Sequence, residues 1–411
     1  MTRVVVTGLG AITPAGPDVA STWATLVAGR SVAGPLTRFD ASGLDARIAA
    51  QVEGFDAEAL LGRKRAHRTA LFSQYAVAAA REAIADAGLT IDEDLGARTS
   101  VHVNTGVSGV IPTAEAVTAL VREGPGAVSP FFVPAMIPSV PACEVAIDQG
   151  IHGPVTAGAL ACASGTAALL DARRLLLSGE SDVAIAGGTD APLTPSLLAG
   201  LGRMGALTAR NDDPAAASRP FDADRDGFVP GEGAVVAVLE REDDARARGA
   251  RILGVLAGGA LTSDAYHLSA PDRQGRFAGA AITQALARAD VAPSEVDYVC
   301  AHGTSTPAND RTETMALRAS LGDAVGRPAV SSPKSMVGHL MGGAGTLSAL
   351  VCLLAMRDGV IPPTANLETV APECEGLDHV MGAARRTPVR AAVANAFGFG
   401  GQNCVVVLTA A

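Results

Sequence analysis

The stretch G-A-L-A-C-A-S-G-T-A-A-L-L, residues 158–170, decides how this chain is interpreted. It places Cys162 where an apolar strand segment, residues 151–161, meets a helix of small and apolar residues. Because that helix is apolar on nearly every side, we expect it in the protein interior. A thiol at the first turn meets unpaired NH groups and the positive end of the helix dipole. We therefore predict that Cys162 has a lowered pKa and acts as a nucleophile; the alternative is a small buried apolar residue.

Composition indicates a layered α/β protein. The 411 residues are 48% hydrophobic and 18% charged, which is typical of a compact globular chain with a large core. Aromatic residues make up only 3% while there are 46 glycines, so small side chains and close backbone packing must fill the interior.

Charge and cysteine usage exclude several classes of protein. A net charge of −10 argues against a nucleic-acid partner, which would need clustered Lys and Arg. The six cysteines are scattered without a C-x-x-C pair, as expected for reduced thiols. Neither a basic leader nor a long apolar run is present, so we expect a cytoplasmic protein with no membrane partner.

The second part of the chain repeats the order of predicted elements found in the first. Predicted strands end at His302 and just before Lys334 and His339, and residues 342–354 form another helix of small and apolar residues. A strand and a glycine loop, residues 395–403, precede the last strand. This repetition predicts a duplicated unit, with halves at residues 1–250 and 251–411.

Two other segments have patterns of their own. Residues 129–141 are apolar and interrupted by prolines, so we expect a packed loop at a pocket or subunit contact. Asp222, Asp224 and Asp226 match the front half of a calcium loop, but Gly233 stands where the closing glutamate is required. We therefore expect no metal.

Titratable groups follow three apolar strands, at Cys162, at His302 and at Lys334 and His339. In α/β proteins the ends of such strands form the active site. A helix-capping thiol with two histidines indicates covalent catalysis, and the glycine loop 398–401 can bring NH groups to a substrate oxygen.

Four motifs together identify a family. They are A-C-A-S-G around Cys162, H-G-T-S-T-P-A-N-D from His302, K-S-M-V-G-H from Lys334, and N-A-F-G-F-G-G-Q-N from Asn395. In this order and over nearly the whole chain, they resemble the β-ketoacyl-acyl carrier protein (ACP) synthase II family. The segment G-G-T-D-A-P from Gly187 is closest to the ketosynthase alpha subunits of bacterial type II polyketide synthases.

The resemblance implies the thiolase-like fold, a five-layered α/β/α/β/α duplication, and extension of an acyl chain by decarboxylative Claisen condensation with malonyl-ACP. Cys162 would carry the acyl chain, and His302 and His339 would act on the malonyl thioester. Lys334 would orient the site. The backbone NH groups of Cys162 and Phe399 would form the oxyanion hole.

Further roles follow from the same resemblance. Positions matching the pantetheine and acyl pocket are Thr304, Thr306, Phe228, His267, Phe399 and Phe132. Tunnel depth is expected to depend on Ser108 and Phe132. The family commonly has a glutamate partner for the lysine where this chain has Ser348, so we expect altered tuning of Lys334.

Partners follow from the chemistry. Substrates would arrive on the phosphopantetheine arm of an acidic ACP, with no other cofactor, and the basic cluster Arg63, Lys64, Arg65 and Arg68 is the expected docking surface. Family members are dimers, and Phe131 and Phe132 are expected at the interface. The mate is either a second copy or a chain length factor.

The pathway stays open between type II polyketide synthesis, which we favour, and type II fatty acid elongation. A non-catalytic chain length factor typically lacks the nucleophile, whereas Cys162 is present here. A thiolase generally has a second cysteine as base, and the glycine loop 398–401 contains none.

Overall fold

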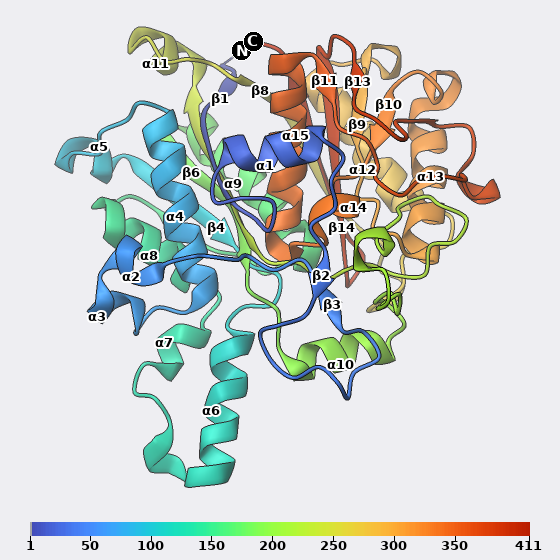
Figure 1. Cartoon of the computed structure of the whole chain (residues 1–411). Coiled ribbons are helices and arrows are strands. Elements are labelled where there is room, and N and C mark those ends of the chain that lie inside the picture. The colour runs from blue at the N-terminus through green and yellow to red at the C-terminus, as the bar shows by residue number, and fades with distance from the viewer. Residues whose placement is uncertain (1) are drawn as a thin grey trace.

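The computed structural model describes residues 2–411, and its centre is one eleven-stranded sheet with the order β12-β10-β9-β14-β15-β8-β1-β7-β6-β4-β5 (Figure 1). The strands are β1 (Val4–Ile12), β4 (Thr99–Asn104), β5 (Val155–Thr156), β6 (Val183–Asp190), β7 (Gly233–Arg241), β8 (Gly254–Ser263), β9 (Tyr298–Cys300), β10 (Ala329–Ser331), β12 (Asp378–His379), β14 (Ala391–Gly398) and β15 (Gln402–Thr409). β1 and β8 pair at only two positions, Val5 with Val255 and Val6 with Gly254. This short contact joins two similar half-sheets.

The two half-sheets have the same topology. Outward from the junction, β1-β7-β6-β4-β5 corresponds to β8-β15-β14-β9-β10. In each, the first two neighbouring pairs are antiparallel and the next two are parallel. The predicted duplication is therefore present in the strand pairing itself.

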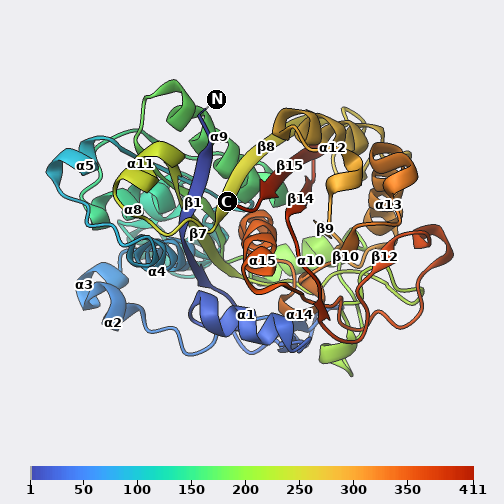
Figure 2. The same ribbon diagram turned by 90° about the horizontal axis from the view of Figure 1, so that it is seen from above.

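Helices complete five layers. They are α4 (Leu71–Asp86) and α8 (Val140–Gln149) outside the first half-sheet, α9 (Ser164–Ser178) and α15 (Ala344–Asp358) between the half-sheets, and α12 (Arg276–Ala289) and α13 (Pro307–Leu321) outside the second. Figure 2 shows α15 between the group with α4 and α8 and the group with α12 and α13. The α/β/α/β/α arrangement predicted from the sequence is confirmed.

Nearly all of α15 and the first half of α9 are buried because their sequences leave no charged face there. Every residue from Ala344 to Ala355 is buried in α15, and α9 is buried from Ser164 to Leu170. Each helix ends at a glycine in the left-handed region, Gly179 with φ 80° and Gly359 with φ 61°.

The central helices cross at two reciprocal glycine–threonine contacts. A Cβ on Gly165 of α9 would lie 2.3 Å from Thr346 Oγ1, and a Cβ on Gly345 of α15 would lie 2.0 Å from Thr166 Oγ1. No larger residue fits at either glycine while the helices keep this separation. The abundance of glycine and alanine in these helices therefore has a direct packing cause.

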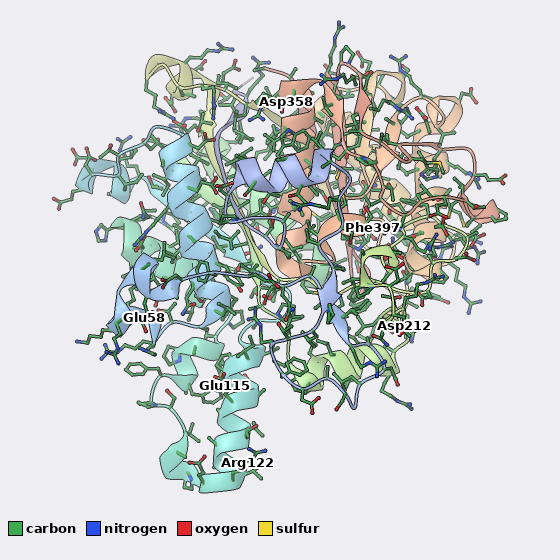
Figure 3. All side chains as sticks on the ribbon, viewed as in Figure 1. Glu58, Glu115, Arg122, Asp212, Asp358 and Phe397 are labelled. Carbon is green, nitrogen blue, oxygen red and sulfur yellow. The ribbon has the colours of Figure 1, made fainter. Side chains whose placement is uncertain are left out.

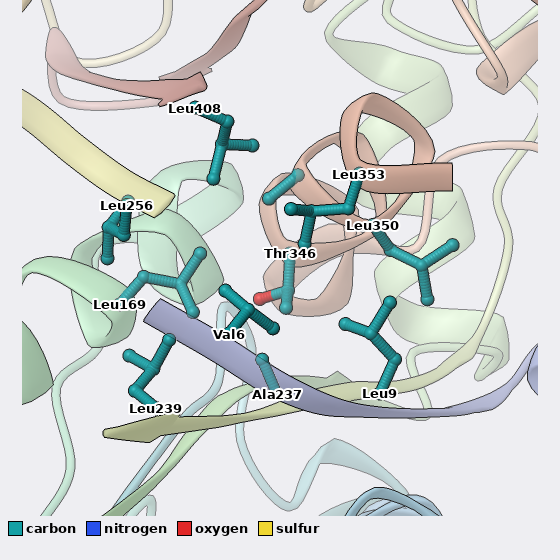
Figure 4. A pocket seen from close by; sticks show the side chains of 11 residues that line it. Val6, Leu9, Leu169, Ala237, Leu239, Leu256, Thr346, Leu350, Leu353 and Leu408 are labelled. Atoms are coloured by element: carbon teal, nitrogen blue, oxygen red, sulfur yellow. The ribbon is translucent and has the colours of Figure 1, made fainter. Parts of the chain in front are cut away.

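A small gap beside this crossing is a packing void. It is enclosed by Val6, Leu169, Leu350 and other apolar residues, with the Thr346 hydroxyl as a polar group (Figure 4), and its volume is about 10 Å³. A buried water needs about two to four polar partners, which the leucine-rich walls do not supply. The void has no ligand-binding character.

One hairpin of helices projects from the body. α6 (Val110–Glu123) and α7 (Phe132–Met136) extend away from the sheet, and Figure 3 shows Glu115 and Arg122 along α6. Several of their apolar side chains are exposed: Val117, Leu120, Val121, Phe131, Val133, Met136 and Ile137. Val121 is 80% exposed, so this surface is apolar and unpartnered in the single chain.

The expectation of a loop over residues 129–141 was wrong in part. α7 lies inside this segment and α8 begins at Val140. Pro134 and Pro141 both fall within the first turn of a helix, where a proline removes no intrahelical hydrogen bond.

Between residues 2 and 411, no helix is long and apolar enough to cross a membrane.

Replacing Gly345 with alanine should destabilise the protein by about 1–3 kcal/mol, because the added methyl collides with Thr166 at the helix crossing. Urea unfolding would measure the change. The Gly345→Ala/Thr166→Ala pair should recover part of the loss, since the colliding hydroxyl is gone.

The matched control is Gly200→Ala in the exposed helix α10 (Pro195–Arg203), where a Cβ meets nothing within 4 Å. It should be neutral or stabilising, by up to about 1 kcal/mol. Equal stability of the Gly345 variant and the wild type would refute the packing argument.

Candidate active site

Cys162 lies in the middle of a short 3-10 turn, η2 (Ala161–Ala163), that leads into α9. The turn starts at Ala161 with φ 47°, a left-handed conformation that is uncommon outside glycine. Behind it lies Gly398, where a Cβ would come within 3.2 Å of the Cys162 nitrogen. The backbone is thus forced to present the thiol at the start of the helix.

The expected low pKa of Cys162 was wrong for this state of the protein. Burial raises the pKa of the thiol to about 11, while Lys334 and the backbone NH groups of Phe399 and Cys162 oppose this shift. The side chain is only 8% exposed, and the loss of hydration outweighs the favourable charges. Cys162 is therefore a neutral thiol near pH 7 and must lose a proton to react.

His302 follows β9 and is held through its backbone. Glu313 of α13 accepts the NH of His302 at 2.8 Å and the NH of Gly303 at 2.7 Å. Asn395 of β14 donates to the same carboxylate at 3.0 Å. The His302 ring is buried, and its Nδ1 has no hydrogen-bond partner in residues 2–411.

His339 follows the short helix α14 (Lys334–Val337), and its tautomer is set by the backbone. The Met341 NH donates to His339 Nδ1 at 3.1 Å, so the proton of the neutral ring is on Nε2. That Nε2 is buried and has no acceptor in the described part of the chain. The Nε2–H group of His339 is therefore an unpaired donor that can bind a ligand oxygen.

The structure brings these three side chains together from both halves. The Cys162 sulfur and one ring nitrogen from each histidine all lie within 4.8 Å of one another. The histidine ring centroids are 5.5 Å apart. Phe228 packs on His339 at 5.2 Å between centroids, which places that predicted residue at the site.

Both histidines are neutral at pH 7. Burial lowers the pKa of His302 well below its usual value, and Lys334 and His339 add to the effect. Burial and Lys334 do the same to His339. Two uncharged imidazoles next to a neutral thiol can move protons and donate hydrogen bonds.

Lys334 is fully buried near this trio. Burial lowers its pKa, while Cys300, Glu313, Cys162 and Asp310 raise it. Ser348, where the family commonly has glutamate, carries no charge and donates to the Ala344 carbonyl of its own helix at 3.3 Å. Counter-charge for Lys334 therefore comes from α13 rather than from α15.

Metal binding fits this trio poorly. To ligate a cation through Nε2, His339 would have to carry its proton on Nδ1, where it would face the Met341 NH. At the calcium-like loop, Asp222 already accepts NH groups from Asp224, Glu368 and Thr369 and pairs with Arg219. Both carboxylate oxygens of Asp222 are therefore already bound by groups of the protein.

The loop that carries Phe399 is held by hydrogen bonds to the adjoining segment, residues 264–268. Gly400 donates to the Leu268 carbonyl at 2.7 Å, and Asp264 donates its NH to the Gly401 carbonyl at 2.9 Å. The Phe399 ring is 38% exposed while its NH faces Cys162. His267 lies on the adjoining exposed loop, where its Nδ1 accepts the NH groups of Ser269 and Ala270, outside the buried trio.

Thr304 and Thr306 lie next to His302. Their hydroxyls are 2.9 Å apart, and Thr306 also caps α13 by accepting the Asn309 NH at 3.3 Å. Thr304 is 5% exposed and thus has little contact with solvent. A pantetheine contact at Thr306 would have to share the hydroxyl with this cap.

A groove runs along α6 and α7 on the first half. Its walls include Ser108, Ile111, Phe132 and the N-terminal part of α10. The predicted tunnel residues Ser108 and Phe132 therefore line one surface. Arg68 lies at its rim, with its guanidinium 4.8 Å from the centre of the Phe131 ring.

The predicted basic cluster divides into two groups. Arg63 and Lys64, on α3 (Arg63–Ala66), and Arg68 are exposed. Arg65 is instead bound to Glu144 at 2.8 Å and to Asp148 at 2.5 Å, which fixes α3 to α8. Arg65 has a structural role that spacing alone could not reveal.

Sequence reasoning missed several residues of the site. Glu313 and Asn395 position His302, the Ser218 hydroxyl donates to the Lys334 carbonyl at 2.8 Å, and Phe397 lies 5.7 Å from His302 between ring centroids. Asn395 begins one of the four quoted motifs, and Glu313 lies three residues after the end of another. The available signal for Asn395 was a polar residue in the otherwise apolar strand β14, whereas α13 carries several polar residues and does not distinguish Glu313.

Comparison with known proteins agrees with this geometry. Models of the β-ketoacyl synthase N-terminal and C-terminal domains match residues 1–245 and 253–368. The chain is 47% identical over 401 residues to a 3-oxoacyl-[acyl-carrier-protein] synthase 2 of Synechocystis, covering 98% of this chain and 96% of that protein. It is 40% identical over 407 residues to the synthase 2 of Coxiella burnetii, with 99% and 98% coverage.

Solved structures agree as well. The ishigamide ketosynthase/chain length factor has a TM-score of 0.93 at 37% identity, with 100% of this chain and 99% of that chain covered. A β-ketoacyl synthase from Burkholderia phymatum gives 0.93 at 34% identity, and a ketosynthase in complex with its type II polyketide acyl-carrier protein gives 0.91 at 30%, both with 100% coverage of each chain. This chain therefore belongs to the β-ketoacyl synthase family of condensing acyltransferases.

Proposed function

We propose that this enzyme extends an acyl chain by decarboxylative condensation with malonyl-ACP in type II polyketide biosynthesis. The observation that carries the chemistry is the joint burial of Cys162, His302 and His339 within 4.8 Å of one another. The substrates would come on the phosphopantetheine arm of the carrier, and no other cofactor is needed.

Acyl transfer comes first. Cys162 gives its proton to His302, whose Nδ1 has no hydrogen-bond partner. His339 cannot accept this proton, because its Nδ1 already accepts the Met341 NH and its Nε2 carries a proton. The sulfur attacks the acyl thioester and forms acyl-Cys162. The proton then passes from His302 to the departing pantetheine thiolate, so the histidine returns to its neutral form.

Decarboxylation and condensation follow. The free Nε2–H of His339 donates to the malonyl thioester oxygen, which stabilises the enolate as CO2 leaves. The enolate carbon attacks the acyl-Cys162 carbonyl, whose oxygen accepts hydrogen bonds from the NH groups of Cys162 and Phe399. The C–S bond breaks as the tetrahedral oxygen re-forms a ketone, and the Cys162 thiolate takes up a proton from solvent, the one proton that the overall condensation consumes.

Fatty acid elongation is the second candidate, because the 47% identical relative in Synechocystis is named a 3-oxoacyl-ACP synthase 2. In favour of polyketide synthesis, the ishigamide ketosynthase/chain length factor matches over the whole chain at 37% identity. A non-catalytic chain length factor role is disfavoured by the presence of all three site residues.

The two pathways can be separated by mass spectrometry of the chain trapped on Cys162 after turnover with the purified carrier. A poly-β-keto or polyene chain supports the polyketide proposal. A saturated fatty chain supports the alternative.

We also propose a dimer through the α6–α7 surface, where seven large apolar side chains are exposed. The partner is a second copy or a chain length factor, as in the ishigamide ketosynthase/chain length factor structure. Light scattering of the chain alone and with a candidate factor distinguishes these two assemblies from a monomer.

Substitution of the site residues should separate the two half-reactions. Cys162→Ala should lose condensation completely but keep malonyl-ACP decarboxylation, because His339 still donates to the thioester oxygen. His339→Ala should lower both by about 10²–10³-fold, the usual cost of one oxyanion donor. Product masses and CO2 release are the measurements, with Cys143→Ala as control. Condensation by Cys162→Ala would refute the mechanism.

The alkylation rate of Cys162 should keep rising with pH up to pH 10, because burial raises its pKa to about 11 and the thiolate is the reactive form. Below the pKa, each pH unit should raise the rate about tenfold. A Cys143→Ala background removes the one partly exposed thiol, since Cys300, Cys352, Cys374 and Cys404 are buried. A plateau below pH 8 would show that the resting protein already holds a thiolate.

Charge reversal at Arg63 and Lys64 should raise KM for malonyl-ACP several-fold and leave kcat nearly unchanged, because exposed charges mainly set the rate of encounter. The effect should shrink as salt is added. The control is Arg386→Glu on β13 (Arg385–Arg386), away from α3 in Figure 1. An unchanged KM would exclude this docking surface.

A further inference from the structure

The turn that carries Cys162 has a counterpart in the second half. η6 (Met341–Gly343) leads into α15 as η2 leads into α9. It also begins with a left-handed residue, Met341 at φ 48° against Ala161 at φ 47°. The second residue of each turn is Cys162 in η2 and Gly342 in η6, so the NH of Gly342 is equivalent to the NH of Cys162.

Each turn packs against the last residue of a strand from the opposite half. η2 lies on the end of β14 and η6 on the end of β6. The terminal residue is Gly398 in β14 and Asp190 in β6, and both pair with the first residue of the next strand, Gln402 or Gly233. Asp190 at the end of β6 thus stands where β14, the strand that packs on the Cys162 turn, has Gly398.

The side chain at this strand end decides whether the backbone NH of the turn is available to a ligand. Beside Cys162, Gly398 contributes no side chain, and the NH is left for a ligand oxygen. Beside Gly342, the Asp190 carboxylate accepts the equivalent NH at 2.6 Å. The protein therefore contains two anion-binding turns, of which one is filled by its own carboxylate.

Asp190 also connects the two segments that surround the reacting groups. Its carboxylate accepts the NH of Gly106 at 2.7 Å, the NH of Val107 at 3.1 Å and the hydroxyl of Thr105. Residues 105–107 lead into the groove beside α6. Gly342 is the neighbour of Met341, whose NH fixes the tautomer of His339.

The backbone packs closely around this carboxylate. Asp190 is fully buried, and a Cβ on Gly342 would lie 2.6 Å from the Gly106 nitrogen and 2.8 Å from the Asp190 carboxylate. A Cβ on Gly106 would lie 3.0 Å from both the Ala161 carbonyl and Asp190. Two backbone segments, residues 105–107 and the η6 turn at Gly342, thus converge on one carboxylate.

We propose that Asp190 is a positioning residue, an internal anion that fills the second anion-binding turn and thereby holds His339 and residues 105–107 in place around Cys162. Burial raises the pKa of Asp190 to about 6, opposed by the hydrogen bonds from Thr105 and from the NH groups of Gly342, Gly106 and Val107, so the carboxylate is ionised above that pH. Its negative charge also raises the pKa of Cys162, in addition to the larger effect of burial. The inference deepens the proposed function, since its activity readout is the condensation described above.

The first test is Asp190→Asn, which keeps the shape and removes the charge and one acceptor. We expect kcat for condensation to fall about 10–100-fold, as is usual when a residue that orients a reacting group is lost. KM for the acyl carrier should change little. The pH profile of Cys162 alkylation should move to lower pH, because a negative charge near the sulfur is gone.

The control is Glu82→Gln. Glu82 on α4 also accepts two backbone NH groups, each at 2.8 Å, but lies in an outer layer. It should lose stability without losing kcat. If Asp190→Asn behaves in the same way, with unchanged kcat and alkylation profile at a temperature where it is folded, the positioning role is refuted.

The second test is Asp190→Gly, which copies Gly398 and opens the turn. Added formate should restore kcat by replacing the missing carboxylate, whereas chloride at equal ionic strength should not. A folded Asp190→Gly variant that formate does not rescue refutes the internal anion; if this variant does not fold, Asp190→Asn decides alone. An inactive wild type in the same assay would instead refute the proposed function.

Discussion

The reciprocal contact of Gly165 with Thr346 and of Gly345 with Thr166 is the constraint on which the rest of the molecule depends. It sets the distance between α9 and α15, and both helices contact both half-sheets. Because each helix begins at a tight turn, the crossing also brings η2 and η6 into contact. The active site is built at the point where the two halves are closest.

Duplication then supplied two similar frameworks, and different residues of each became functional. Cys162 in the first half corresponds to Gly342 in the second. Cys300 and His102 pair with equivalent residues of β14 and β6, so His302 corresponds to Asn104 two residues later. Asn104 is structural, since it donates to the Ser164 carbonyl at 2.9 Å and accepts the Gly158 NH at 2.6 Å. One complete site therefore needs both halves.

Burial gives this site its electrostatic character. The same loss of hydration raises the pKa of the thiol and lowers the pKa of both imidazoles, so all three groups are neutral at rest. In the proposed mechanism, charge appears only during reaction, on the sulfur, the enolate and the tetrahedral oxygen. Fixed NH donors in a dry cavity would stabilise that charge without reorganising.

The sequence by itself determined the α/β layers, the duplication, the buried central helices and the identity of Cys162, His302 and His339, because apolar periodicity and short motifs are local properties. It could not determine the pKa of Cys162, the ion pairs that immobilise Arg65, or the hold of Glu313 on the His302 backbone. These depend on residues far apart in the chain and on how much water their packing removes. The role proposed for Asp190 belongs to the same group, since a carboxylate at a strand end becomes an internal anion only when the fold places residues 105–107 and Gly342 around it.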